Sequence, residues 1–271
     1  MSTSVLKFEN VSLSFDGVEK VLDGISLEMY AGDTLIILGA AGTGKTVMVK
    51  IALWFLTATS GRIRLFGQDV TGFNEQQWFA VRPRIGMLFQ EGGLFDSLTI
   101  EENVAYPLVN RSKLTAEQVK PQVEEALKFV ELGHTLEKFP SELSGGMRRR
   151  VGIARAAISN PDLLLYDSPT AGLDPITANR IMALIIQERE IRNATSAIIS
   201  HRFQDGHMMA NFRYNPESKK LERMPEDSPL RQRTRFLVMH DGRIVFEGNE
   251  RELDASRDPY VSKFSMHRSI H

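Results

Sequence analysis

One short stretch of the chain, GAAGTGKT at Gly39–Thr46, has the residue types and spacing of a phosphate-binding loop. It fits the pattern G-x-x-x-x-G-K-[ST], follows the apolar run TLIILG and precedes a segment with helical character. In that setting successive backbone N–H groups point at an anion, and glycines let the backbone approach it closely. Lys45 would reach the β- and γ-phosphates of a nucleotide, and the Thr46 hydroxyl would hold Mg²⁺. The expected binding residues are Gly39, Ala40, Ala41, Gly42, Thr43, Gly44, Lys45, Thr46 and Val47.

A second candidate is Asp167, which closes the apolar run LLLYD. The carboxyl ends of strands in an open α/β sheet meet beside the ligand site, so this carboxylate could bind Mg²⁺ through water. Strand-ending aspartates also commonly cap the next turn, and only the phosphate loop favours the metal interpretation. The residue after it is Ser168.

A third candidate is LSGGM, where Ser144 is a natural N-cap and Gly145 and Gly146 expose the first N–H groups of the following helix. Taken alone, this motif predicts only an ordinary capped helix.

The elements that must hold these residues follow from hydrophobic patterning. VLKFENVSLSF and GISLEMY alternate apolar and polar residues, which predicts an antiparallel sheet with a turn at Asp16-Gly17. TLIILG, IGMLF, LLLYD and SAIIS are short apolar runs typical of buried strands, and helical segments separate them. We expect helices over Thr46–Leu56, across much of Thr99–Asn160 with a stop at Gly133, and after Pro175, and a hairpin at FLVMHDGRIVFEG.

Strands that alternate with helices predict an α/β fold with a mainly parallel sheet. We expect one domain over 1–250, with a core of about 1–90 and 160–250 and a helical subdomain inserted at about 91–159. Asn215–Arg235 is polar and contains prolines, which predicts a solvated loop within a surface insertion at 203–235, and 251–271 is expected to be a tail.

Composition narrows the possible functions. The 271 residues carry 33 Lys plus Arg and 34 Asp plus Glu, a balance that offers no basic field for nucleic acid. The absence of cysteine excludes disulfides, thiolate metal sites and a cysteine nucleophile. Without a signal peptide or an apolar run of about 20 residues, we expect a cytoplasmic protein that acts on membranes only through partners.

Taken in order, the phosphate loop, LSGGM, LLLYD, AGLD and a histidine after SAIIS resemble the nucleotide-binding subunit of an ABC transporter over nearly the whole chain. The resemblance implies a P-loop NTPase core, ATP and Mg²⁺ as cofactors, and dimerisation around ATP with a second ATPase chain. By resemblance, Ser144 and Gly146 contact the ATP of the partner chain and Asp174 lies at the dimer interface.

The same resemblance implies roles for three further residues. Gln90 takes the Q-loop position, where it senses Mg²⁺ and the attacking water, and His201 takes the position of the switch histidine at the γ-phosphate. Phe15 falls where an aromatic ring stacks on adenine, although it could equally belong to the core. Metal contacts are therefore expected from Thr46, Gln90 and Asp167, with no other metal, since His207 lacks neighbours at ligand spacing.

QEGGLFDSLTIEENVAYPL at Gln90–Leu108 is similar to Mla-type ATPases, which move phospholipid between bacterial membranes. This narrower resemblance implies an integral membrane permease and an MCE-domain lipid-binding protein as candidate partners. In the family, this region meets the permease.

The family has glutamate where this chain has Ser168, and a serine hydroxyl cannot accept the proton of the attacking water near neutral pH. Three explanations stay open: pairing with a different ATPase that keeps its glutamate, a homodimer with two weakened sites that either turns over slowly or has Gln90, Glu91 or His201 as a substitute, and an introduced change. The rival functions are a non-transport ABC protein acting on DNA or ribosomes, and a regulatory subunit that binds ATP without hydrolysing it.

Overall fold

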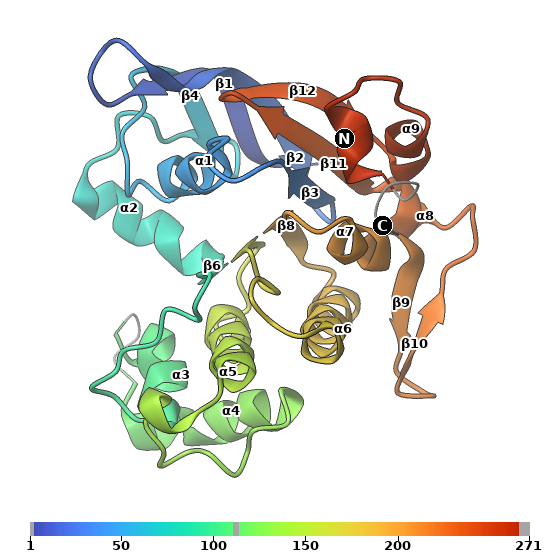
Figure 1. Ribbon diagram of the computed structural model, residues 1–271. Coiled ribbons are helices and arrows are strands. Elements are labelled where there is room, and N and C mark those ends of the chain that lie inside the picture. The colour runs from blue at the N-terminus through green and yellow to red at the C-terminus, as the bar shows by residue number, and fades with distance from the viewer. Residues whose placement is uncertain (1–2, 111–113, 266–271) are drawn as a thin grey trace.

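The computed structural model describes residues 3–110 and 114–265 (Figure 1). A small antiparallel sheet lies at the top of Figure 1, a group of helices lies at the bottom, and a larger sheet lies between them. Within the described residues, no helix is both long enough and apolar enough to cross a bilayer.

The antiparallel sheet has the strand order β2-β1-β4-β5. Asp16 fixes the turn between its first two strands, because Oδ1 accepts hydrogen bonds from the N–H groups of Val18 and Glu19, both at 2.9 Å. The predicted antiparallel pairing is thus confirmed. The strands are β1 (Ser4–Ser14), β2 (Lys20–Tyr30), β4 (Ser60–Leu65) and β5 (Gln68–Asp69).

The central sheet has the order β12-β11-β3-β8-β7-β6, in which β12 pairs antiparallel with β11 and the other neighbouring pairs are parallel. This agrees with the predicted mainly parallel sheet. Its strands are β3 (Thr34–Leu38), β6 (Ile85–Leu88), β7 (Leu163–Asp167), β8 (Thr195–Ile199), β11 (Thr234–His240) and β12 (Arg243–Gly248).

The side chains of β3 alternate between two apolar layers. Ile36 and Leu38 belong to the layer that the sheet shares with the helices, and Leu35 and Ile37 belong to the layer shared with the antiparallel sheet. All four are at most 1% exposed. Burial of each such side chain stabilises the fold by about 1.5–3 kcal/mol, so the strand ahead of the phosphate loop is held firmly on both faces.

Of the helices, α3, α4 and α5 lie together and form the lower region of Figure 1. In chain order, the helices up to Arg192 are α1 (Lys45–Ala52), α2 (Glu75–Val81), α3 (Ile100–Val109), α4 (Ala116–Phe129), α5 (Gly145–Ala157) and α6 (Pro175–Arg192), with 3₁₀ turns η1 (Arg82–Arg84) and η2 (Pro140–Glu142).

Two helices end earlier than the sequence predicts, for the same reason. The chain leaves α1 through Trp54 and α4 through Glu131, both in the left-handed region with φ of 59° and 60°. In each case the next N–H bonds back five residues, from Phe55 to the Lys50 carbonyl at 2.8 Å and from Leu132 to Leu127 at 2.7 Å. These are Schellman-type ends, so the helices stop before Leu56 and Gly133.

The expected loop at Asn215–Arg235 is wrong in part, because this region is largely folded. Strand β9 (Phe212–Asn215) pairs with β10 (Lys220–Arg223) in a hairpin beside α6, at the right of Figure 1. Tyr214 and Leu221 pack against the helical core layer, which anchors the hairpin. Helices α7 (Phe203–Asn211) and α8 (Pro229–Gln232) flank it.

The end of the chain also folds onto the core. It forms α9 (Glu250–Asp254) and the 3₁₀ turn η3 (Val261–Phe264). Val261 is 1% exposed and belongs to the helical core layer. The part of the expected tail beyond residue 265 lies outside the described residues.

Candidate nucleotide site

The loop between β3 and α1 presents an open helix start. Gly42 and Gly44 adopt φ of 83° and 94°, values that L-residues with a Cβ rarely reach. Gly44 is the N-cap of α1, and no side chain caps that helix. The first N–H groups and the positive end of the helix dipole are therefore available to an anion.

Lys45 is 9% exposed and curls back over the loop. Its Nζ donates to the carbonyl oxygens of Gly39 and Ala40, at 2.8 and 2.7 Å, and lies 3.3 Å from the Thr43 hydroxyl. Among the ion pairs of the described residues, none involves Lys45. Burial lowers the pKa of the ammonium, and the charge of Asp167 opposes that shift. A buried cation with only backbone and hydroxyl partners favours an anionic ligand.

The loop forms one wall of a cavity of about 540 Å³. Gln90 follows β6, Ser168 follows β7 and His201 follows β8, and all three also line the cavity. Parallel strands bring their carboxyl ends to one edge of the sheet, which explains how residues so far apart in sequence meet. The lining residues are Val21, Ala41, Gly42, Thr43, Gly44, Lys45, Thr46, Val47, Gln90, Ser168, Ala171, Ile199 and His201.

Asp167 lies next to this cavity without lining it. Its side chain is buried, 4% exposed, and Oδ1 accepts a hydrogen bond from the Ser168 hydroxyl at 3.0 Å. Ser168 has φ of 51°, in the left-handed region, and its N–H donates to the Ile199 carbonyl at 2.9 Å. The serine side chain therefore stands between the cavity and the buried carboxylate, and the lining residues include no aspartate or glutamate.

LSGGM and the Asp174 end of AGLD lie outside the cavity, although Ala171 of AGLD lines it. Ser144 caps α5 by accepting from the N–H of Met147 at 3.3 Å, and Asp174 caps α6 by accepting from Ile176 and Thr177, both at 3.0 Å. Hydrogen bonds from Thr177 lower the pKa of Asp174.

These two helix starts touch one another, since a Cβ on Gly146 would lie 2.6 Å from the Thr177 methyl carbon. Ser144, Gly145, Gly146 and Asp174 do not line the cavity.

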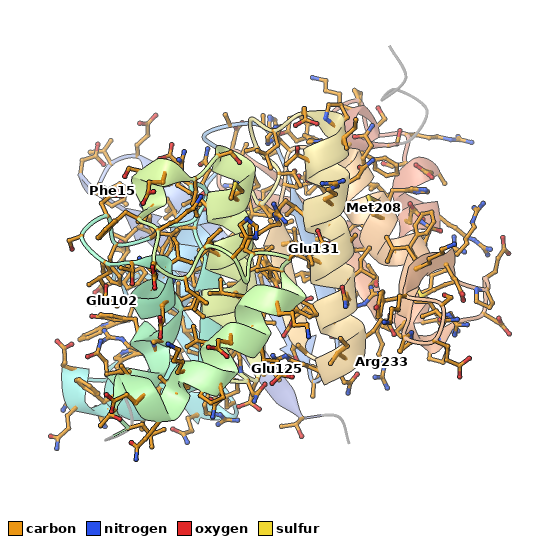
Figure 2. The ribbon with its side chains drawn as sticks, turned by 90° about the horizontal axis from the view of Figure 1, so that it is seen from below. Phe15, Glu102, Glu125, Glu131, Met208 and Arg233 are labelled. Carbon is orange, nitrogen blue, oxygen red and sulfur yellow. The ribbon has the colours of Figure 1, made fainter. Side chains whose placement is uncertain are left out.

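Phe15 lies in the turn after β1 and is 65% exposed, at one edge of the molecule in Figure 2. It neither lines the cavity nor belongs to either apolar core layer. The alternative that Phe15 is a core residue is therefore wrong, while the adenine contact remains a prediction. Gly39 and Ala40 also lie outside the lining.

Two positioning residues are absent from the sequence-based prediction. Arg149 of α5 is buried and donates from Nε to the Gln90 carbonyl at 2.9 Å and from its terminal nitrogen to the Ala171 carbonyl. It ties together two loops that line the cavity. Burial lowers the pKa of its guanidinium.

Asp205 of α7, 1% exposed, is the second. Its Oδ2 accepts from Thr170 at 2.5 Å and from Ser200 at 2.7 Å. These hydroxyls flank Ser168 and His201, so Asp205 joins the ends of β7 and β8. Asp205 lies 35 residues from Thr170 in the sequence. The only sequence feature that could have indicated this role is an acidic residue near a predicted strand end.

Comparison with known proteins identifies relatives of this chain. The chain is 30% identical to the intermembrane phospholipid transport system ATP-binding protein MlaF of Haemophilus influenzae, over 97% of this chain and 91% of that protein. It is 31% identical to the methionine import ATP-binding protein MetN of Bifidobacterium longum, over 97% of this chain and 61% of that protein. It is 34% identical to the probable ribonucleotide transport ATP-binding protein mkl of Mycobacterium leprae, over 72% and 56%.

The chain thus spans little more than half the length of the last two relatives. A solved dimeric structure of the ATP-binding cassette MJ0796 bound to ADP and Pi matches it with a TM-score of 0.74 and 25% identity, over 90% of this chain and 98% of that one. The family model described as ABC transporter matches residues 22–171, more than half of the chain. The chain belongs to the ABC transporter family and carries its ATP-binding domain.

Proposed function

We propose that this chain is the ATP-binding subunit of an ABC transporter and binds MgATP in the cavity beside Lys45. The observation that carries the proposal is the buried ammonium of Lys45, which lies at an uncapped helix start and has only backbone and hydroxyl partners. Phosphate oxygens would supply the anion that this site lacks. The ADP and Pi in the solved relative support the same ligand class.

The donor set around the cavity also fits Mg²⁺, which prefers oxygen ligands and usually keeps several waters. The Thr46 hydroxyl and the Gln90 amide line the cavity, and the Asp167 carboxylate lies directly behind Ser168. Bound metal would neutralise phosphate charge. Thr46 and Gln90 would hold it directly, and Asp167 would hold it through water.

A second ATPase chain is the expected partner across the open side of the site. Ser144, Gly146 and Asp174 lie together at two helix starts, outside the cavity of their own chain. Helix starts favour anions, so Ser144 and Gly146 suit the phosphates of a facing subunit, and Asp174 would lie at the subunit interface. The solved relative is itself described as dimeric.

An integral membrane permease is the proposed second partner. A groove of about 420 Å³ lies between the sheet and the helical region, and its lining includes residues next to Gln90 in the sequence. Phe55, Phe95 and Tyr106 on its rim are 55%, 42% and 42% exposed, an unusual concentration of aromatic surface. A permease segment in this groove would hold the chain at the cytoplasmic face of a membrane.

We propose phospholipid as the transported substrate, with an MCE-domain protein as a further partner. Support comes from the similarity of Gln90–Leu108 to Mla-type ATPases and from the alignment with MlaF, which spans 91% of that relative. Methionine is the main competitor, because of the similarity to MetN. Turnover of the chain assembled with its permease in lipid nanodiscs, with added methionine as the comparison, separates them: stimulation by methionine alone would refute the lipid proposal.

A catalytically poor site is the second candidate function, and Ser168 specifically favours it. The cavity lining contains no carboxylate that could accept a proton from water. A chain of this kind would bind ATP, turn over slowly by itself, and complete the site of a partner that keeps its glutamate.

Titration calorimetry of the purified chain with MgATP tests the nucleotide site. We expect binding by the wild type and none by Lys45→Ala, while Lys50→Ala, which removes an exposed lysine from the same helix, should bind normally. Equal binding by wild type and Lys45→Ala would refute the proposal.

A further inference from the structure

The segment after the last strand reaches the phosphate loop through one side chain, Tyr260. The Ala40 N–H donates to the Tyr260 hydroxyl at 3.1 Å, and that hydroxyl donates to the Met239 carbonyl at 3.1 Å. One hydroxyl thus bridges the loop and the end of β11. Residues 220 positions apart meet here.

The peptide group that Tyr260 holds is the one on which Lys45 rests. The carbonyl of Gly39 and the N–H of Ala40 belong to a single planar unit. Its oxygen accepts from Lys45 at 2.8 Å and its N–H donates to Tyr260 at 3.1 Å. Because the unit is rigid, the tyrosine fixes the direction in which the Gly39 carbonyl points and therefore the position of the Lys45 ammonium.

Tyr260 is itself held on several sides. Its N–H and that of Val261 donate to Asp258 Oδ1 at 2.8 and 2.9 Å, and its ring stacks on His240 with 3.8 Å between centroids. Val261 is buried in the core. The hydroxyl therefore has little freedom to follow a moving loop, which makes it an anchor.

The other end of the same segment is fixed to α7. Glu250 of α9 accepts from Asn211 at 2.6 Å and lies 2.6 Å from His207 Nδ1. Helix α7 begins two residues after His201, which lines the cavity. Residues 250–265 therefore contact both the phosphate loop and the helix that follows His201.

We propose that Tyr260 is a positioning residue of the nucleotide site, which orients the Gly39–Ala40 peptide and pre-organises the loop for phosphate. This inference rests on the proposed function. Removal of the hydroxyl leaves the Ala40 N–H and the Met239 carbonyl without their partner, and the loop gains conformations that do not bind. One hydrogen bond of this kind corresponds to about two- to twelvefold in an equilibrium constant.

The test compares MgATP binding by wild type, Tyr260→Phe, Tyr214→Phe and Lys45→Ala. Tyr260→Phe keeps the ring and its stacking on His240. Tyr214→Phe removes the same group from the β9–β10 hairpin, outside the nucleotide cavity. We expect the dissociation constant for MgATP to rise two- to twelvefold in Tyr260→Phe and to stay at the wild-type value in Tyr214→Phe. In the nucleotide-free Tyr260→Phe chain, the Ala40 amide should exchange hydrogen faster than in the wild type. In the assembled transporter, KM for ATP should rise while kcat is kept.

Each outcome bears on the inference. Wild-type affinity in Tyr260→Phe would overturn it and leave the nucleotide site standing, since Lys45→Ala reports on that site separately. Equal losses of affinity and thermal stability in both tyrosine variants would assign Tyr260 a merely structural role and overturn it too. No binding by the wild type would overturn the proposed function and this inference together.

Discussion

Replacement of Ser168 by glutamate should accelerate ATP hydrolysis. The backbone at this position is already held, because the Ser168 N–H donates to Ile199 and the Ser168 carbonyl accepts from Ala171 at 3.1 Å. The side chain faces the cavity that holds Lys45. A glutamate carboxylate would extend two carbon atoms farther into that space than the serine hydroxyl.

The expected increase in the hydrolysis rate follows from the need to remove a proton from the attacking water. Neither the serine hydroxyl nor any other lining group supplies a carboxylate, and a positioned general base contributes about 10²- to 10⁴-fold. That range corresponds to about 3 to 5.5 kcal/mol of the activation barrier. Backbone strain does not offset it, because serine and glutamate share the same Cβ and hence the same left-handed φ of 51°.

The assay is single-turnover hydrolysis of ATP by the assembled transporter, beside Ser168→Gln. Glutamine has the length and hydrogen-bonding capacity of glutamate without its basicity, so its turnover should stay near that of the wild type. MgATP affinity should change little in either variant, because Lys45 and Thr46 are untouched. A Ser168→Glu chain that binds MgATP and hydrolyses no faster would refute the argument, and so would an equal gain in Ser168→Gln.

Three further predictions concern the same site. Lys45→Met should abolish MgATP binding in calorimetry yet leave the thermal unfolding temperature of the nucleotide-free chain unchanged or higher, because it removes a buried charge without an ion-pair partner; a large drop in that temperature would contradict this. MgATP affinity should fall as pH rises, because phosphate binds the protonated form of Lys45. Burial lowers the pKa of Lys45, so the fall should begin below the pKa of 10.5 of an ordinary lysine. A flat profile between pH 7 and about 10 would count against this prediction. Asp205→Ala should lower the free energy of unfolding in urea by about 1–3 kcal/mol for each hydroxyl left unpaired and slow turnover, whereas Asp205→Asn keeps an acceptor and should lose less; equal losses would show that Thr170 and Ser200 find other partners.

The central sheet and the phosphate loop could be predicted because their signals are local. TLIILG is apolar on both faces, and burial of both faces of β3 is what such a run requires. The position of Asp167 beside the phosphate loop follows from one topological rule about strand ends, whereas the places of Gln90 and His201, which line the cavity, are implied by the family resemblance. That rule needs only the order of strands and no knowledge of loops.

The parts that could not be predicted depend on contacts between distant residues. The β9–β10 hairpin has short, charged strands around a proline-containing turn, and the packing of Phe212, Tyr214 and Leu221 on the core distinguishes it from a loop. The Schellman ends at Trp54 and Glu131 place ordinary residues where glycine would be expected. Nothing in the local sequence around Tyr260 indicates the Ala40 amide.

The number of catalytic sites that gain a base distinguishes the two kinds of dimer. In a homodimer both sites contain Ser168, and the glutamate variant should raise total turnover by the full 10²-fold or more. In a heterodimer whose partner keeps its glutamate, one site already hydrolyses ATP. A glutamate in the other site can therefore at most roughly double the total turnover. In that case the loss from Ser144→Ala should be large, since this chain's LSGGM would complete the working site. A strong effect of Ser144→Ala together with a weak effect of Ser168→Glu therefore identifies a mixed pair. A gain of about 10²-fold or more from Ser168→Glu identifies two copies of this chain, in which Ser144→Ala also lowers turnover because each LSGGM completes the facing site.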